Sequence, residues 1–340
     1  TNPAAVNAFL VGIGYTYRFL PGGSEHFTRA LELDHDFIAP RGFLVSGLVG
    51  MGDTTAARTH VQVLVSLKPQ ASPFEQAFIG WCEALVRGAV EALPRHDRVG
   101  LGYAPHNNFP LFALAQLLWE TGRWREAVAP TREAMASGWR FAPLYALWGE
   151  LAIEAGELSG LRDTLEDALS FATPDSHVAG LLEALALFDG DTGAARGYGA
   201  EFRAGMGAAA VGGGYAQLAG SFRTLAQRAR ERGKLTTALS LLRRAVNGRA
   251  RQPIVRLELA RVLAESGKRR EAESHYRTAV QTELRDPETL LAAGSVAELL
   301  GRSGDARRDY SRYLEVAPDG PDAIRVRERL RVLGRPSGPP

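Results

Sequence analysis

Apolar side chains recur with a helical period between Leu259 and Val280, and a glycine interrupts this period half-way. Leu259, Val262 and Leu263 form an i, i+3, i+4 stripe, which predicts one amphipathic helix. A second stripe follows, formed by Ala272, Tyr276, Ala279 and Val280. Gly267 lies between the stripes, where glycine commonly stands just past the end of a helix. The pattern therefore predicts a helical hairpin, in which neither helix can bury its stripe alone.

The same hairpin recurs with a period of 34 residues. Segments 225–246, 259–280 and 293–314 align without gaps. Three columns of identical residues mark the period, namely Gly233, Gly267 and Gly301, then Ala238, Ala272 and Ala306, and finally Pro253, Pro287 and Pro321. Alanine lets two helices approach closely, and proline suits the first turn of a helix because its missing N–H needs no partner there. Stacked hairpins of this kind form a solenoid rather than one globular core.

This pattern resembles the tetratricopeptide repeat (TPR) family, whose unit is also 34 residues long. The resemblance rests on small residues in the first helices and on Ala-x3-aromatic pairs followed by proline in the second, namely Ala226, Ala260, Gly294, Ala272 with Tyr276, Ala306 with Tyr310, and Pro318. It implies an all-α fold, a right-handed α-solenoid of antiparallel helix pairs. It also implies a concave surface, lined mainly by the first helix of each pair, that holds peptides or helices of other proteins.

The repeat continues towards the N-terminus in a more divergent form. Gly122, Gly156 and Gly190 keep the spacing of 34, whereas residues 86–108 and 203–214 break the period. We expect about nine units and a terminal cap. The predicted parts are an N-terminal array over residues 1–202, a Gly-rich insertion or hinge over 203–218, C-terminal repeats over 219–320, a capping helix over 321–334 and a flexible tail over 335–340.

Composition indicates a folded protein without a membrane span. Of the 340 residues, 45% are hydrophobic and 23% are charged, a balance typical of folded chains. No apolar run reaches the roughly 18 residues of a membrane-spanning helix. Cys82 is the only cysteine, which excludes an intrachain disulfide framework, and its position beside Trp81 predicts a buried side chain. The compartment stays open, with the cytoplasm favoured over export after removal of a leader.

Charge is distributed unevenly along the chain. Residues 1–220 hold 15 basic and 23 acidic side chains, whereas residues 221–275, the basic band, hold 14 and 5. This band can contact phosphates or acidic proteins, and a solvated charged face is a third explanation. Its aromatic residues, Phe222 and Tyr276 at its end, occupy packing columns, so surfaces for base stacking are missing and a nucleic-acid partner is not favoured.

Motifs that carry chemistry are weak in this sequence. Gly205-x-Gly207-x-x-Ala210 fits a dinucleotide-binding fingerprint, but no strand precedes it, and a linker or hinge explains the glycines better. Polar residues gather in the loop 93–110, namely His96, Asp97, His106, Asn107 and Asn108, where both a functional cluster and a plain connection stay open. Common nucleotide-binding, zinc-binding and hydrolase motifs do not occur. We expect no enzyme activity, no catalytic residue, no cofactor and no metal site.

Candidate protein-binding residues are those of the first helices that the packing columns leave over. They are Phe112, Gln116, Trp119, Glu150, Glu154, Arg223, Gln227, Arg230 and Arg261. Phe112 and Trp119 would anchor an apolar segment if exposed, although burial inside the stack fits the pattern equally well. The arginines would hold carboxylates through paired hydrogen bonds. Arg223 and Gln227 depart from the Lys/Asn set with which TPR proteins clamp a C-terminal carboxylate, so we do not predict that ligand.

These observations lead to three hypotheses. The leading one is a non-enzymatic scaffold that binds other proteins, including as a stable subunit of a larger assembly. The alternative is a structural protein that self-associates head to tail into an oligomer or filament. A third is regulatory nucleic-acid contact through the basic band. The first 40 residues also resemble the start of repeat regions that follow kinase or winged-helix domains in bacterial regulators, so a detached regulatory region and a stand-alone subunit both stay open.

Overall fold

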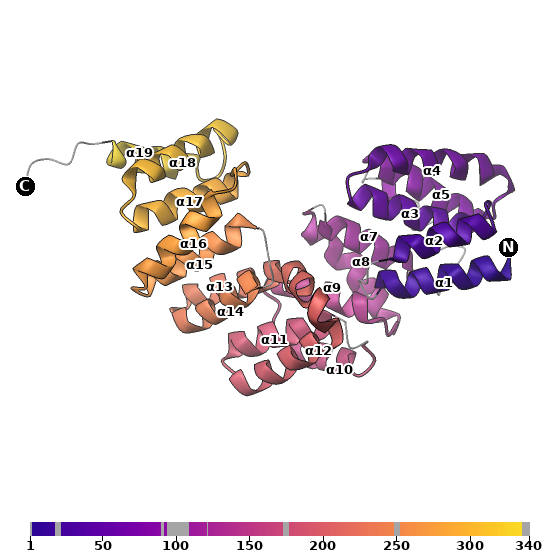
Figure 1. Ribbon diagram of the computed structural model, residues 1–340, viewed down its shortest axis with the longest axis horizontal. Coiled ribbons are helices and arrows are strands. Elements are labelled where there is room, and N and C mark those ends of the chain that lie inside the picture. The colour runs from indigo at the N-terminus through magenta and orange to yellow at the C-terminus, as the bar shows by residue number, and fades with distance from the viewer. Residues whose placement is uncertain are drawn as a thin grey trace, which may run out of the picture. The chain divides into compact units, whose positions relative to one another are not determined.

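The chain is built from paired helices. The computed structural model describes residues 2–17, 22–89, 92–93, 109–120, 122–172, 177–247 and 252–334. All regular structure in these residues is helical, and consecutive helices pack side by side across short turns (Figure 1).

The chain divides into two compact units. The first comprises Thr1–Leu151 and Asp167–Thr173, and the second comprises Ala152–Glu166 and Pro174–Pro340. The boundary falls in two helices, α9 (Ala142–Ala155) and α10 (Leu161–Leu169). A hinge at residues 203–218 stays a prediction.

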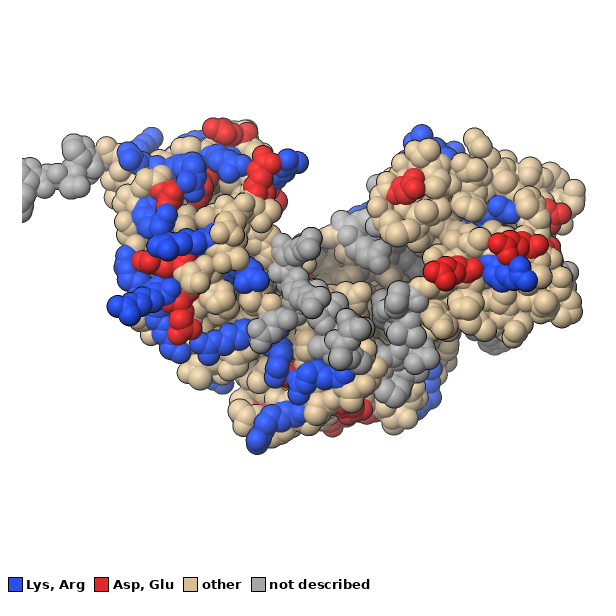
Figure 2. All heavy atoms as spheres, viewed as in Figure 1, with Lys and Arg blue, Asp and Glu red and all other residues tan. Residues whose placement is uncertain are grey.

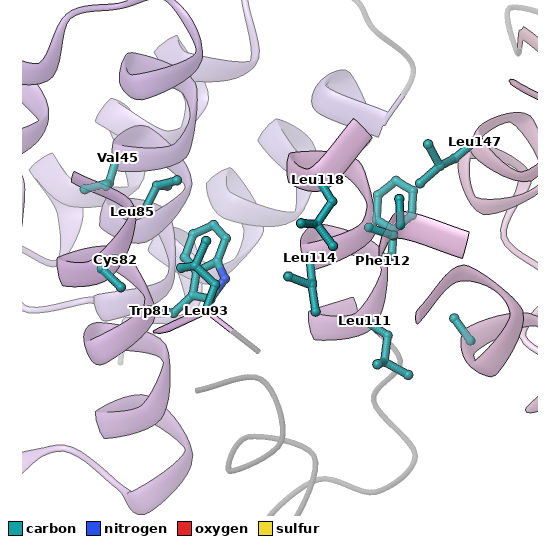
Figure 3. Close-up of a cluster of buried hydrophobic side chains, with 14 of the residues drawn as sticks. Val45, Trp81, Cys82, Leu85, Leu93, Leu111, Phe112, Leu114, Leu118 and Leu147 are labelled. Atoms are coloured by element: carbon teal, nitrogen blue, oxygen red, sulfur yellow. The ribbon is translucent and has the colours of Figure 1, made fainter. Parts of the chain in front are cut away.

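The N-terminal unit begins with two helical hairpins. The helices before α9 are α1 (Pro3–Tyr17), α2 (Gly23–Leu33), α3 (Ile38–Gly50), α4 (Thr54–Leu67), the short 3-10 helix η1 (Lys68–Gln70), α5 (Pro73–Val86), α7 (Phe109–Glu120) and α8 (Trp124–Ala136). Side chains of α3, α5, α7 and α9 contribute to one apolar core (Figure 3). Cys82 is fully buried in this core, as the sequence predicted, and burial raises the pKa of its thiol.

The second unit continues the same arrangement. Its helices after α10 are α11 (His177–Asp189), α12 (Thr192–Gln217), α13 (Ala219–Glu231), α14 (Leu235–Asn247), α15 (Pro253–Glu265), α16 (Arg269–Val280), α17 (Pro287–Leu299), α18 (Ser303–Val316) and α19 (Ala323–Leu333). We call α13–α19 the C-terminal array. Within it the first helices α13, α15 and α17 contact one another in sequence order, so they form one face of the stack. Helix α19 stands where a capping helix was predicted, and residues 335–340 lie outside the described residues.

The repeated glycines end the first helix of each pair. The six glycines at 34-residue columns, from Gly122 to Gly301, have φ between 69° and 86°, a conformation that glycine adopts without steric cost. At Gly267 the glycine N–H donates to Ala264 O at 3.0 Å, and Lys268 N–H donates to Leu263 O at 2.8 Å. The turn therefore satisfies carbonyl groups at the helix end and starts the second helix.

The Gly-rich segment is helical, which differs from the linker that the sequence suggested. Residues 203–217 continue α12 without interruption. Glycine disfavours a helix by about 1 kcal/mol relative to alanine, but buried aromatic side chains stabilise both ends of the segment. Phe202 is fully buried and Tyr215 is 3% exposed, and their rings meet edge to face at 4.9 Å. Tertiary packing therefore outweighs the local propensity.

Candidate protein-binding groove

A groove of about 640 Å³ lies on the C-terminal array and is lined mainly by α15, α17 and α19. Its apolar lining comes from Ile254, Leu291, Ala292, Leu299 and Val326. Its polar and charged lining comes from Glu258, Arg261, Glu288, Ser295, Glu298, Tyr310, Arg325 and Arg329. An apolar concavity with a few placed polar groups is the usual composition of a binding site.

The repeat period places these residues on one face. On α15, Ile254, Glu258 and Arg261 are spaced i, i+4 and i+7, so they lie along one side of the helix. One period after Arg261 stands Ser295 of α17, and one period later stands Arg329 of α19. Stacking the three helices therefore aligns one repeat column across the groove.

Charged groups around the groove are mostly paired within the array. Glu298 accepts a hydrogen bond from the Tyr310 hydroxyl at 3.1 Å and forms an ion pair with Arg329. Glu288 pairs with Arg223 of α13, with 2.5 Å between Arg223 Nη1 and Glu288 Oε1. Figure 2 shows acidic side chains lying among the basic ones over the C-terminal helices.

Arg261 is the exception among the groove arginines. Its side chain is 19% exposed, and its Nε lies 4.0 Å from Glu258 Oε2, beyond hydrogen-bond range. Within the described part of the chain, Arg261 Nε is buried and has no hydrogen-bond partner. The Nε of this guanidinium therefore makes only a long ion pair with Glu258, with which an incoming carboxylate can compete.

Tyr310 lines the groove as a neutral hydrogen-bond donor. Burial raises the pKa of its hydroxyl, while a hydrogen bond with Ser295 and the positive charges of Arg325 and Arg261 oppose the shift. The phenol therefore keeps its proton at neutral pH, and its hydroxyl donates a hydrogen bond to Glu298.

The other candidates of the basic band also lie on first helices of the array. Arg230 of α13 forms an ion pair with Glu265 of α15 at 2.9 Å. Gln227 is half-buried and stands one period before Arg261 in the same column. Arg230 therefore joins neighbouring repeats, whereas Arg223 connects α13 with α17, two repeats further on. A ligand would have to displace a glutamate to reach either arginine.

The three candidates on α7 are not freely exposed. Phe112 is 5% exposed, and its ring meets Phe141 edge to face at 5.2 Å and Trp139 at 6.4 Å. Trp119 is half-buried and packs against the same core, and Gln116 is half-buried. Of the two possibilities that the sequence left open for Phe112, the structure shows burial inside the stack, because downstream aromatic residues cover the ring.

The two acidic candidates lie on α9. Glu154 accepts a hydrogen bond from the Thr224 hydroxyl at 2.9 Å, and its backbone carbonyl accepts one from Arg228 at 3.0 Å. Both partners belong to α13, so Glu154 joins helices that are distant in sequence. Glu150 is half-buried.

Neither a metal-binding group nor a membrane-spanning helix occurs in the described part of the chain, and the polar loop that the sequence singled out lies mostly outside it. His96, Asp97, His106, Asn107 and Asn108 lie outside the described residues. The described part of the chain holds no group of three or more side chains with metal-ligand geometry. None of its helices is both long and apolar enough to cross a membrane.

Residues of the basic band are largely engaged in ion pairs. Arg243 pairs with Glu271 at 3.0 Å, and Arg269 lies 3.5 Å from Glu273. Phe222 and Tyr276 are both fully buried. Neither ring can therefore stack on a nucleic-acid base without unfolding the repeat.

A buried charge network in the second unit was not predicted from the sequence. Glu183 is fully buried, its Oε2 accepts a hydrogen bond from Tyr215 at 2.5 Å, and its Oε1 lies 2.7 Å from Arg244 Nε. Burial raises the pKa of Glu183, while Tyr215 and the positive charge of Arg244 oppose the rise. The sequence signal is a single glutamate in the apolar run from Val178 to Phe188.

Comparison with known proteins identifies the fold. No family model and no curated protein sequence matches this chain. The human IFIT1 dimer with PPP-AAAA is similar over 92% of this chain and 77% of that one, with a TM-score of 0.54 and 14% identity. A tetratricopeptide repeat protein from Parabacteroides merdae ATCC 43184 is similar over 78% of this chain and 100% of its own, with a TM-score of 0.50 and 12% identity. The chain has the tetratricopeptide repeat fold. The fold class predicted from the sequence, an all-α solenoid of helix pairs, is thereby confirmed.

Proposed function

We propose that this chain is a non-enzymatic TPR scaffold whose C-terminal groove holds a segment of another protein, as a subunit of a larger assembly. The observation that carries the proposal is the position of Arg261, a largely buried guanidinium without a hydrogen bond from its Nε, next to the apolar lining of the groove. The segment would place an apolar side chain on Leu291 and Leu299 and an aspartate or glutamate on Arg261.

Pairing within the array supports this choice of contact. The neighbouring Arg223, Arg230 and Arg329 already hold glutamates, so their charges contribute less to an incoming acidic group. A ligand that pairs with Arg261 gains a charge-assisted hydrogen bond and competes only with the long 4.0 Å ion pair between Arg261 and Glu258. Such bonds contribute about 1.5–3 kcal/mol each.

The test is affinity capture from native lysate with the intact chain, an Arg261→Glu variant and an Arg307→Glu control. Arg307 lies exposed on α18, a second helix of the same array. We expect a stoichiometric protein that the wild type and Arg307→Glu retain and that Arg261→Glu loses. Equal retention by Arg261→Glu, with circular dichroism showing that all three chains are folded, would show that the contact lies elsewhere.

A further inference from the structure

Helix α1 exposes an apolar face that carries no charge. None of its 15 residues is Lys, Arg, Asp or Glu. Leu10 is 58% exposed, Val11 is 38% exposed and Tyr15 is 37% exposed. Exposed apolar residues that gather on one helix indicate an interaction surface rather than chance.

The opposite face of α1 already has its partners within the chain. The ring of Phe9 meets Phe27, Phe37 and Phe43 at centroid distances of 5.8, 5.4 and 5.6 Å. A Cβ atom built on Gly12 would come within 2.7 Å of the Phe27 ring, so the two helices approach closely there. Leu10 and Val11 therefore belong to a second face, which the fold of the N-terminal unit leaves uncovered, and Tyr15 lies at the edge of this face with its ring centroid 4.8 Å from that of His26.

The exposed face has the spacing of a helix–helix seam. Pro3, Asn7, Leu10 and Gly14 are all exposed and follow one another at intervals of four, three and four residues. Two helices pack along positions of this spacing, and Leu10 is the large apolar side chain among the four. A Cβ atom on Gly14 would meet nothing within 4 Å. Another helix can therefore approach the backbone closely at this point.

The helix at the end of the C-terminal array has a different surface. Helix α19 also exposes the apolar Ile324 and Val332, but its solvent-facing surface carries charged residues as well, namely Arg325, Arg327, Glu328 and Arg331. This polar face is what a solenoid cap needs in order to stay dissolved. The uncharged face of α1 lacks that property.

We propose that the α1 faces of two copies of this chain pack against each other and form a two-fold symmetric dimer. An uncharged face requires a partner that buries no unpaired charge. Among the helices that the structure describes, α1 alone lacks charged residues, so the complementary surface is a second α1. Packing α1 on α19 of another copy would remove the charged side chains of α19 from water, including the ion pair between Arg325 and Asp322, and this desolvation disfavours head-to-tail assembly.

The size of the face sets the expected affinity. A helix of 15 residues is about 22 Å long, so two such faces bury roughly the 1,000 Å² at the lower limit of specific interfaces. A dimer of this kind dissociates on dilution. We expect a dissociation constant in the range of about 1–100 µM.

Sedimentation velocity over a concentration series tests the dimer. We compare the intact chain with Leu10→Glu and with the control Ile324→Glu, because Ile324 is 74% exposed on α19. We expect the wild type and Ile324→Glu to dimerise alike, and Leu10→Glu to weaken the dimer at least about tenfold. A wild type that stays monomeric up to about 100 µM, or a Leu10→Glu variant that dimerises like the wild type, overturns the proposal.

Thiol cross-linking then distinguishes the two-fold dimer through α1 from head-to-tail contact between α1 and α19. Because Cys82 is fully buried, a bis-maleimide reports only on an introduced cysteine. We expect Leu10→Cys alone to give a cross-linked dimer and Ile324→Cys alone to give none. Cross-linking only in a mixture of the two variants would establish head-to-tail contact and overturn the proposed dimer.

Discussion

Gly294 offers a direct test of how the repeat columns specify packing. This glycine is buried in α17, opposite the aromatic column of α18. A Cβ atom at this position would lie 2.6 Å from both Cδ1 and Cε1 of Tyr310. Gly294→Ala therefore forces either the ring or the helix to move.

The free-energy cost of overpacking at Gly294 can be separated from the gain in helix propensity that alanine brings. Tyr310 is 4% exposed and its hydroxyl is held by Glu298, so the ring cannot swing aside without losing a hydrogen bond. Overpacking of this kind costs about 1–3 kcal/mol. Alanine also stabilises a helix interior by up to about 1 kcal/mol relative to glycine. Gly197→Ala in α12 supplies that gain alone, because a Cβ atom on Gly197 meets nothing within 4 Å.

The distribution of tryptophan separates the two units in one experiment. All five tryptophans lie in the N-terminal unit, namely Trp81, Trp119, Trp124, Trp139 and Trp148. Tryptophan fluorescence therefore follows that unit during urea unfolding, whereas circular dichroism at about 222 nm follows helices of both units. We expect Gly294→Ala to lower the free energy of unfolding by about 1–3 kcal/mol relative to Gly197→Ala, in the dichroism transition only.

Two outcomes would refute this reasoning. If Gly294→Ala were as stable as Gly197→Ala, the close contact with Tyr310 would not constrain the repeat. If the fluorescence transition shifted as far as the dichroism transition, the C-terminal repeats would not unfold separately from the N-terminal unit.

Three further predictions concern buried polar groups. Glu183→Ala leaves the buried Tyr215 hydroxyl without its acceptor, whereas Arg244 is partly exposed and can turn to water. We therefore expect urea unfolding to show a loss of about 1–3 kcal/mol, and a smaller loss of about 0.5–1.5 kcal/mol for Tyr215→Phe. Burial and the charge of Arg41 lower the pKa of His60 in the folded chain. The unfolded chain therefore binds more protons, and the free energy of unfolding falls as the pH drops below about 6.5. His60→Gln should flatten this pH dependence in fluorescence-monitored unfolding between about pH 5 and 8. Cys82 is fully buried with a raised pKa, so a thiol reagent should label it only after denaturant is added, and rapid labelling of the native chain would contradict its placement in the core.

The repeat was predictable because its columns express steric requirements. Glycine at Gly267 follows from the positive φ of the turn, and alanine at Ala272 follows from close helix contact, as its complete burial reflects. Both constraints act within one hairpin, so a period of 34 residues shows them clearly.

The partners of the charged residues were not predictable, because they lie far apart in the sequence. Arg223 pairs with Glu288 across 65 positions, and Thr224 bonds Glu154 across 70. Burial of Phe112 likewise depends on Trp139 and Phe141, which no column of the repeat specifies.

Some residues of the groove could nevertheless have been predicted from the sequence. Extending the period from Arg261 leads to Ser295 and Arg329, which both line the groove. Arg261 was already a candidate, but the lack of a hydrogen-bond partner for its Nε is a property of side-chain geometry alone.

Site-specific photo-cross-linking tests the proposed scaffold function most directly. A photoreactive phenylalanine analogue replaces Leu299, which lines the groove and is 47% exposed, or Val316, which is 51% exposed at the end of α18 and does not line it. In native lysate we predict a discrete protein adduct from position 299 that Arg261→Glu abolishes, and none from position 316. Adducts that form equally at both positions, or only at position 316, would contradict the assignment of the groove as the protein-binding site.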